Sequence, residues 1–199
     1  MKEMLVLIAH PDDELIWMGG TILENPQWDW TIVSLCRRDD QDRMPKFKKI
    51  CRYYYRAKSI ISDLDDEVLQ PLEIEEVKQK IKDNLPKRKY NFVFTHGKNG
   101  EYGHMRHNEI HQAVKELVAE GEIQCDKVYY FSYVPGEEKA SHDSNLSIPV
   151  ANKKADWIVE VSDQTFAKKQ KLIKDVYGFK SDVFETISCK KKEAFVVSP

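Results

Sequence analysis

The sequence predicts an α/β fold in which a mostly parallel, doubly wound sheet carries helices on both faces. Two observations lead to this prediction. Short apolar runs alternate with amphipathic helical segments along nearly the whole chain, and such alternation is typical of parallel βαβ units with right-handed crossovers. The chain also has only 199 residues, so we expect one domain that spans residues 1–199.

The first strand is predicted at Glu3–Ala9. This run is short and apolar and stops abruptly at His10, as a buried parallel strand does. A helix is expected directly after it, because a proline at Pro11 followed by the acids of residues 12–14 is typical of a helix start.

The other elements follow from the same patterns. Further strands are predicted at Thr31–Cys36, Asn91–Thr95, Lys127–Val134 and Trp157–Val161, with an edge strand at Ala194–Val197. Helices are predicted at Pro45–Ile61, Ile74–Leu85, His107–Ala119 and Gln164–Val176. The polar stretch Pro135–Lys154 has no clear period, and we expect a long surface loop there.

Composition and charge exclude several classes of protein. A formal net charge of −2 provides no basic excess for nucleic acid or a membrane surface. The longest early apolar run is far shorter than the roughly 20 residues of a spanning helix, and it lacks the features of a signal peptide. We therefore expect a protein without a membrane anchor that stays in the cytoplasm. The four cysteines form no CxxC pair, which favours free thiols.

Side chains able to bind a metal follow two of the predicted strands. They are His10, Asp12 and Asp13 after the first strand, and His104, His107 and His111 after the strand at Asn91–Thr95. In a doubly wound sheet these two strands are neighbours where the strand order reverses, and ligands bind at that point. Imidazole and carboxylate groups are good zinc ligands, and a catalytic zinc uses three of them. The two clusters together predict a metal site.

Each cluster alone also has a purely structural interpretation. The acids of residues 12–14 could only stabilise a helix N-terminus, and His10 could be a hydrogen-bonded core histidine. His107 and His111 lie on one helical face, which fits either a metal site or a partly exposed surface. The convergence of two independent clusters favours the metal site.

Two motifs identify a family resemblance. Residues 9–14 (AHPDDE) resemble the opening motif of the PIG-L/LmbE family of metal-dependent N-deacetylases. Residues 100–107 (GEYGHMRH) resemble its second motif, in which two residues separate a pair of histidines. The resemblance covers more than half of the chain. It implies a Rossmann-like sheet and the removal of acetyl groups from N-acetylglucosamine units.

The resemblance also implies a ligand set. His10, Asp13 and His107 would hold a zinc ion, and iron(II) or cobalt(II) would suit two histidines and one carboxylate as well. Spacing alone would instead favour His107 with His111 as the ligand pair. With the family's ligand set, His111 supports the surrounding structure.

Catalytic roles follow from the same resemblance. Asp12 would be the general base that takes a proton from the attacking water and delivers it to the leaving amine. A protonated His104 or the hydroxyl of Tyr102 would stabilise the charge that develops on the carbonyl oxygen.

Substrate contacts are predicted at two arginines. Many relatives have Pro-Asp where this chain has Met105-Arg106. Arg106 would therefore change the orientation of the metal ligand or bind an anionic substrate group. Arg43 is the first choice among the charged residues 37–43, most of which are expected to be a solvated charge run. At least one tyrosine of residues 53–55 is expected to be exposed, at a loop contact or in a homo-oligomer interface.

Three functional hypotheses result. The leading one is a zinc-dependent hydrolase that deacetylates a small-molecule amino sugar or its conjugate. The second is an amidase for another N-acyl metabolite. The third is a metal- or ligand-binding module without catalysis. No basic stripe or motif supports binding to nucleic acid.

Overall fold

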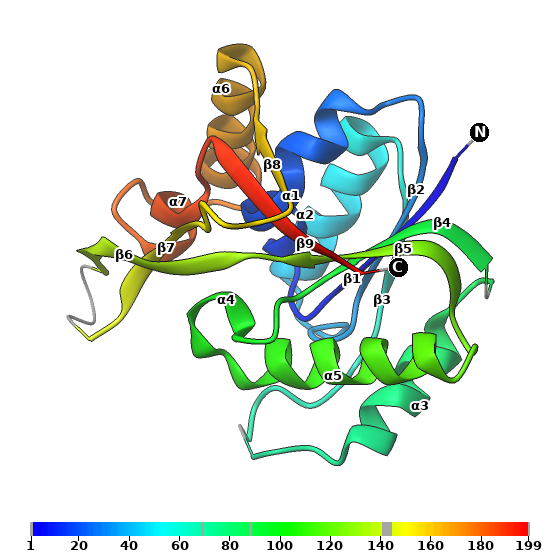
Figure 1. Cartoon of the computed structure of the whole chain (residues 1–199). Coiled ribbons are helices and arrows are strands. Elements are labelled where there is room, and N and C mark those ends of the chain that lie inside the picture. The colour runs from blue at the N-terminus through cyan, green and yellow to red at the C-terminus, as the bar shows by residue number, and fades with distance from the viewer. Residues whose placement is uncertain (1, 69, 88, 141–144, 199) are drawn as a thin grey trace.

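A computed structural model of the chain describes residues 2–68, 70–87, 89–140 and 145–198. These residues form a seven-stranded sheet with helices on both faces and a separate two-stranded ribbon (Figure 1). The predicted α/β fold with a mostly parallel sheet is therefore confirmed.

The strands of the main sheet lie in the order β3-β2-β1-β4-β5-β9-β8. Their bounds are β1 (Glu3–Ile8), β2 (Asp29–Ser34), β3 (Lys58–Ile61), β4 (Lys89–Thr95), β5 (Gln124–Phe131), β8 (Trp157–Glu160) and β9 (Lys192–Ser198). The first five strands in this order, β3, β2, β1, β4 and β5, pair in parallel. Strand β9 is antiparallel to both of its neighbours, β5 and β8. The strand order reverses between β1 and β4.

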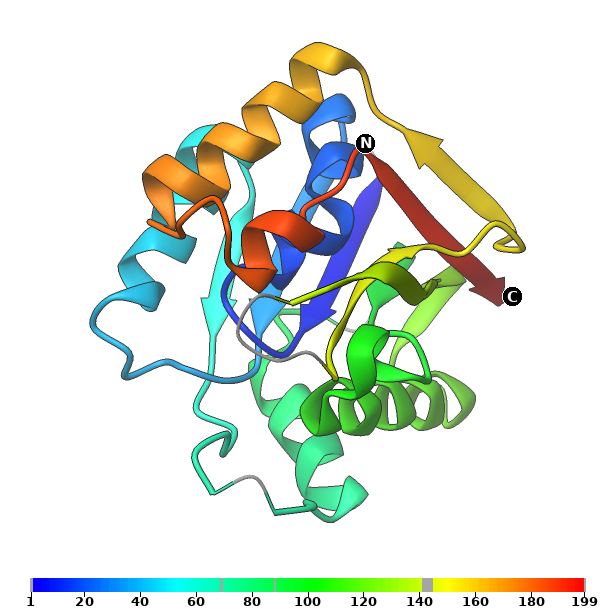
Figure 2. The ribbon, with the colours of Figure 1, turned by 90° about the vertical axis from the view of Figure 1, so that its left-hand side faces the viewer.

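The helices cover the two faces of the sheet (Figures 1 and 2). One face carries α1 (Asp13–Glu24), α2 (Arg43–Ile50) and α6 (Asp163–Lys171), and the other carries α3 (Ile74–Asn84) and α5 (Met105–Ala119). Two π-helical turns extend α2 and α6, η1 (Cys51–Tyr55) and η2 (Leu172–Val176). Two short helices, α4 (Gly100–Gly103) and α7 (Phe184–Ser188), lie outside these layers.

Strand β1 lies between two apolar cores. Met4, Val6 and Ile8 belong to the core under α1 and α2, and Leu5 and Leu7 to the core under α3 and α5. All five side chains are fully buried. Successive side chains of a strand point to opposite faces, so a continuous apolar run is what a strand covered on both sides requires.

The helix predicted at Pro45–Ile61 is shorter than expected. It ends with η1 at Tyr55, because Arg56 adopts a left-handed conformation with φ of 56°. The last residues of the predicted helix form β3, which pairs in parallel with β2. The β-branched pair Ile60-Ile61 favours a strand at this position.

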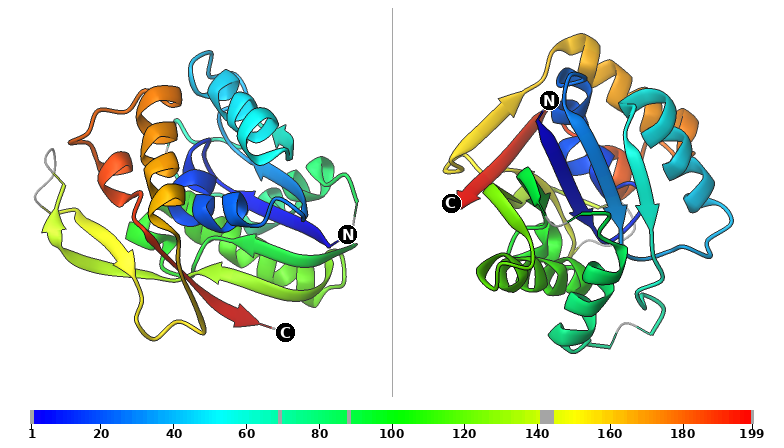
Figure 3. Two further views of the ribbon diagram at one scale, coloured as in Figure 1. Left: turned by 90° about the horizontal axis from the view of Figure 1, so that it is seen from above. Right: turned by 90° about the vertical axis from the view of Figure 1, so that its right-hand side faces the viewer.

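The surface loop predicted at Pro135–Lys154 is also wrong for its described residues. A ribbon forms from β6 (Tyr133–Lys139) and β7 (Ser147–Ala151) and extends beyond the sheet next to α7 (Figure 3). Residues 141–144 of the predicted loop lie outside the described residues. Pro135 pairs with Pro149, and a two-stranded ribbon tolerates prolines that a central strand would exclude.

The predicted edge strand at the C-terminus is β9, but it lies between β5 and β8 rather than at the edge. Two other expectations are confirmed, that of free cysteines and that of an exposed tyrosine among residues 53–55. All four cysteines are free, and Tyr53 and Tyr54 are exposed while Tyr55 is buried. Within the described part of the chain, we find no helix with the length and apolar character needed to cross a membrane.

A buried ion pair ties β9 to α6, and its carboxylate also reaches α1. Lys169 Nζ lies 2.6 Å from Glu193 Oε1, and both side chains are fully buried. The same carboxylate accepts hydrogen bonds from the backbone N–H groups of Gly20 and Thr21 at 2.7 and 2.8 Å. A Cβ atom at Gly20 would lie 2.3 Å from a methyl carbon of Val161, so the close approach of α1 to the residue that follows β8 requires glycine there.

We predict that Lys169→Met lowers the free energy of unfolding by about 3–5 kcal/mol, because the Glu193 carboxylate stays buried without its cation. Urea unfolding measures this change. Lys191→Met is the matched control, since its pair with Asp163 lies at the surface and should contribute little. Equal stability of the two variants would contradict the prediction.

Candidate metal and active site

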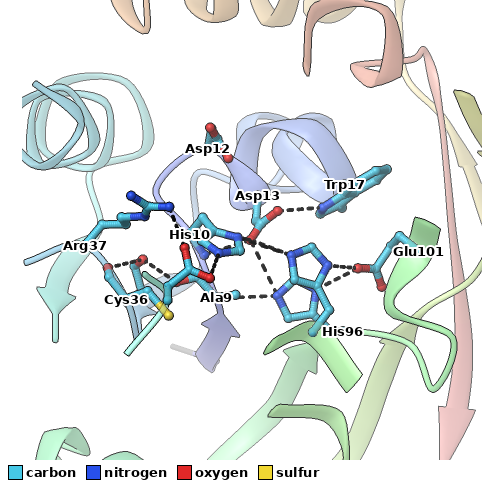
Figure 4. A network of polar contacts seen from close by, with 12 residues as sticks. Ala9, His10, Asp12, Asp13, Trp17, Cys36, Arg37, His96 and Glu101 are labelled. Atoms are coloured by element: carbon cyan, nitrogen blue, oxygen red, sulfur yellow. Dashed lines mark hydrogen bonds and ion pairs between the residues drawn. The ribbon is translucent and has the colours of Figure 1, made fainter. Parts of the chain in front are cut away.

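The two predicted clusters meet at the C-terminal ends of β1 and β4 (Figure 4). The backbone N–H of Ala9 donates to His96 Nε2 at 2.9 Å, which joins the two strand ends directly. Helix α1 begins at Asp13, and the first turns of α5 bring His107 to the same place. Residues far apart in the chain therefore face one another at the point where the strand order reverses.

Three buried donor atoms form a nearly equilateral triangle. His10 Nδ1 lies 3.3 Å from Asp13 Oδ2 and 3.3 Å from His107 Nε2, and Asp13 Oδ2 lies 3.4 Å from His107 Nε2. Donor atoms that bind a tetrahedral zinc at about 2.0–2.1 Å lie about 3.4 Å apart. The triangle therefore has the dimensions of three ligand positions around one ion.

The other nitrogen of each imidazole meets a carboxylate. His107 Nδ1 donates to Glu101 Oε2 at 2.6 Å, and His10 Nε2 lies 3.2 Å from Asp66 Oδ1. Asp66 in turn pairs with Arg37 at 2.6 Å. Carboxylates in this position fix the tautomer of a histidine and turn its free nitrogen toward a metal.

The electrostatics of the triangle favour a positive charge. Although burial lowers the pKa of His107, the carboxylates of Asp13 and Glu101 raise it to about 10. Burial raises the pKa of Asp13, but contacts with His107 and His10 bring it well below its usual range. A cation among these donors is therefore stabilised, and the residues present fit a divalent metal ion.

His96 was not predicted and is not one of the three donors. It lies within reach of Asp13 and His107 in a possible metal-binding group, but both of its nitrogens are already used. Its Nε2 accepts the N–H of Ala9, so Nδ1 carries the proton and donates to Glu101 at 2.8 Å. The ring stacks on His107 with centroids 3.7 Å apart. His96 therefore positions the donors instead of binding the ion.

Glu101 connects the second cluster. Its carboxylate accepts hydrogen bonds from His96, from His107 and from the backbone N–H of Gly97. Burial raises its pKa, but the two histidines lower it to about 2. The backbone of Glu101 is left-handed, with φ of 57°, a conformation that costs free energy in a non-glycine residue. The turn is therefore shaped to aim this carboxylate inward.

Asp12 lies beside the triangle and points away from it (Figure 4). Its Oδ2 accepts a hydrogen bond from Arg43 Nη1 at 2.9 Å. Burial raises the pKa of Asp12 to about 7, although the charge of Arg43 opposes this shift. A buried carboxylate with a pKa near neutrality is suited to proton transfer.

A cavity of about 50 Å³ opens beside these groups. His10, Asp12 and Asp13 form its polar floor, and its apolar wall consists of Ile16, Trp17, Tyr102 and Phe184. The remaining lining residues are Arg43 and Glu185, whose side chains are partly exposed. A volume of this size holds a few waters or a small organic group.

His104 and Tyr102 lie at the same site. The His104 ring is 4.7 Å from that of His10 and 4.8 Å from that of His107. Burial, followed by the positive charges on these two histidines, lowers the pKa of His104 to about 3. The predicted protonated state of His104 is therefore unfavourable, and its neutral imidazole is the form to consider. Burial raises the pKa of Tyr102 well above its usual range, so its hydroxyl stays protonated.

Two other predicted residues lie outside the cavity. Arg106 is fully buried and binds Glu109 at 2.7 Å and the backbone carbonyl of Asp65. This burial does not support the predicted contact between Arg106 and a substrate. His111 Nδ1 donates to the backbone carbonyl of His96 at 2.9 Å, and its supporting role stays a prediction.

Sequence reasoning missed His96, Glu101 and Asp66 as members of the site. A signal existed for His96, because it follows β4 directly as His10 follows β1. Glu101 lies in the short helix α4 and Asp66 in the loop after β3, and no spacing rule distinguishes these two acids from their neighbours.

The fold and this cluster define a class of Rossmann-like α/β proteins with a histidine–aspartate site at the reversal of strand order. The family model for GlcNAc-PI de-N-acetylase, PIG-L, matches residues 5–118, more than half of the chain. The chain therefore belongs to the PIG-L family of deacetylases.

Individual proteins that resemble this chain share only a small part of its sequence. An uncharacterized protein of Acanthamoeba polyphaga mimivirus is 27% identical over 191 residues, which cover 86% of this chain and 76% of that protein. The N,N'-diacetylchitobiose deacetylase from Pyrococcus horikoshii has a TM-score of 0.71 at 18% identity, covering 100% of this chain and 84% of that chain. The 4-carboxy-2-hydroxymuconate hydratase GalB from Pseudomonas putida has a TM-score of 0.59 at 16% identity, covering 94% and 83%. The fold is thus shared by proteins of different activity.

We predict that Glu101→Gln weakens zinc binding by about 10- to 100-fold, because a neutral amide no longer holds the two imidazole N–H groups as a carboxylate does. Competition with a chromophoric chelator measures this affinity. Glu116→Gln in α5 is the control, because this partly exposed carboxylate contacts Gln112 and Lys78 and none of the three donors, and it should bind zinc as the unmodified protein does. Equal affinity of the Glu101 variant and the control would contradict the role of Glu101.

Proposed function

We propose that this protein is a metal-dependent hydrolase that removes the N-acetyl group from an N-acetylglucosamine-type amino sugar or its conjugate. The observation that carries the proposal is the position of Asp12. A buried carboxylate with a pKa of about 7 lies next to three metal-binding donors and lines the same small cavity. This combination supplies a base and a cation site where one amide group can enter.

His10, Asp13 and His107 would hold the ion. A bound zinc would lower the pKa of water and polarise the amide carbonyl. Iron(II) or cobalt(II) would suit the same donors. The chain's own contribution is the orientation of these donors by Asp66 and Glu101 and the exclusion of bulk water by a buried site.

Asp12 would manage the proton. As the base it accepts a proton from the attacking water, and as the conjugate acid it delivers that proton to the leaving amine. A pKa near the working pH serves both steps. The hydrogen bond from Arg43 stabilises the charged form of Asp12 and so keeps the base deprotonated before the first step.

His104 and Tyr102 would stabilise charge on the carbonyl oxygen. Because His104 is held neutral, it would donate an imidazole N–H without a full positive charge. The hydroxyl of Tyr102 is a second donor at the cavity wall. One such donor typically contributes about 10²–10³ in rate.

The cavity supports a short acyl group. Its volume of about 50 Å³ and its wall of Ile16, Trp17 and Phe184 suit a methyl group and its carbonyl better than a long chain. This observation favours an acetyl substrate over the longer N-acyl metabolites of the alternative hypothesis.

We predict that Asp12→Ala retains about one zinc per chain and loses nearly all activity, whereas Asp13→Ala loses both, since only Asp13 offers a donor atom to the ion. Elemental analysis measures the metal, and acetate release from N-acetylglucosamine conjugates measures the activity. N-hexanoyl analogues are the substrate control and should react poorly. Wild-type turnover by Asp12→Ala would refute the base. Absence of zinc from the wild-type protein after reconstitution would refute the metal mechanism.

We also predict that Arg43→Ala shifts the acid limb of the pH profile of kcat/KM to higher pH. The Arg43 cation lowers the pKa of Asp12, so its removal raises that pKa. The base is then protonated over a wider range, and a rise of one unit lowers activity about 10-fold on the acid side. Arg38→Ala, which loses a surface pair with Asp63, is the control. An unchanged limb, or a shift to lower pH, would contradict the prediction.

A further inference from the structure

Asp12 has a strained backbone. Its φ is 121° and its ψ is −27°, a region that residues with a Cβ atom rarely adopt. A conformation of this kind persists only where the surroundings impose it, and such strain is concentrated at functional sites. The contacts that impose it on Asp12 therefore matter for the proposed base.

Hydrogen bonds hold the peptide groups of Asp12 on both sides. Its carbonyl accepts the N–H groups of Leu15 and Ile16, both at 2.9 Å, as the first bonds of α1. Its own N–H donates to Glu14 Oε2 at 3.0 Å. Of these contacts, only the one to Glu14 depends on a side chain.

Glu14 is itself fixed from a distant part of the chain. Its side chain is fully buried, and its second oxygen accepts the hydroxyl of Tyr177 at 2.8 Å across 163 residues of sequence. Tyr177 follows η2, and its backbone carbonyl accepts Lys46 Nζ of α2 at 2.8 Å. The tyrosine is thus anchored to a neighbouring helix and does not line the cavity.

We propose that Tyr177 and Glu14 form a brace that holds Asp12 in its left-handed conformation, and that both are positioning residues for the proposed base. Tyr177 orients the Glu14 carboxyl, and Glu14 orients the Asp12 peptide. The side chain of Asp12 then leaves the backbone toward the cavity, while the side chain of the next residue, Asp13, points to the other two donors, His10 and His107. The inference rests on the proposed function for its effect on catalysis, but the brace itself is a property of the fold.

A nearby tyrosine provides a matched comparison. Tyr55 lies in the same apolar core as Tyr177 and is equally buried, but its hydroxyl has no hydrogen-bond partner among the described residues. Loss of either hydroxyl removes the same atom from the same core. Only the loss at Tyr177 would release Glu14.

The experiment compares Tyr177→Phe with Tyr55→Phe in the zinc-loaded protein. One readout is hydrogen exchange of the Asp12 amide by ¹⁵N NMR, which reports the bond to Glu14 without requiring activity. The others are kcat, KM and zinc content. We expect Tyr177→Phe to speed exchange of this amide and to lower kcat about 10-fold at unchanged KM and zinc content, because misplacement of a catalytic group costs turnover. Tyr55→Phe should change neither exchange nor kcat.

A second pair of variants tests Glu14. In Glu14→Gln, the neutral amide can still accept the N–H of Asp12 and form a hydrogen bond with Tyr177. We therefore expect the kcat of Glu14→Gln to be at least 10-fold higher than that of Glu14→Ala, and its Asp12 amide to exchange more slowly. Equal exchange in Tyr177→Phe and Tyr55→Phe would overturn the brace. Faster exchange with unchanged kcat would overturn its role in catalysis. If the wild-type protein has no hydrolase activity, the proposed function fails, and the exchange data alone then decide whether the brace exists.

Discussion

The parallel pairing of β1 with β4 brings two strand ends together, although the residues that join them, Ala9 and His96, lie 87 positions apart. The three candidate metal donors all follow from this contact. The chain leaves β1 through His10 and enters α1 at Asp13, and it leaves β4 through His96 and enters α5 just before His107. Since apolar cores cover both faces of the sheet, polar groups can gather only at the ends of the strands.

Because these groups are buried at the ends of β1 and β4, each charge among them needs a partner. Three carboxylates, those of Asp13, Asp66 and Glu101, surround two imidazoles that lie almost wholly out of solvent. Unpaired buried charges are costly, so each carboxylate has a cationic or hydrogen-bonding partner. Without a metal ion the partner is a proton on His107, whose pKa is about 10. An ion that displaces this proton would inherit the same favourable surroundings.

Much of this could be predicted from the sequence, for identifiable reasons. The fold followed from the alternation of apolar runs and amphipathic segments, and the position of the donors followed from residues 9–14 and 100–107. The errors lie where local patterns are weak. The end of the helical segment formed by α2 and η1 depends on the left-handed Arg56, and the ribbon of β6 and β7 combines prolines with polar residues. The positions of Glu101 and Asp66 depend on local conformations that no periodicity encodes, and the neutral state of His104 is a consequence of burial and of charges that only folding brings close.

The residue before the second-motif histidine, Arg106, shows how the loop after β3 and the turn before α5 share the work of supporting the site. The family resemblance leads to the expectation of an acid directly before the second-motif histidine, and this chain has a cation, Arg106, there. Arg106 is satisfied away from the cavity by Glu109 and by the loop carbonyl of Asp65. The orientation of His107 does not suffer, because Glu101 reaches its Nδ1 from the preceding turn and also holds the His96 ring that stacks on it. The carboxylate that orients His107, the proposed metal ligand, therefore comes from α4, which leaves residue 106 free to stabilise the loop after β3.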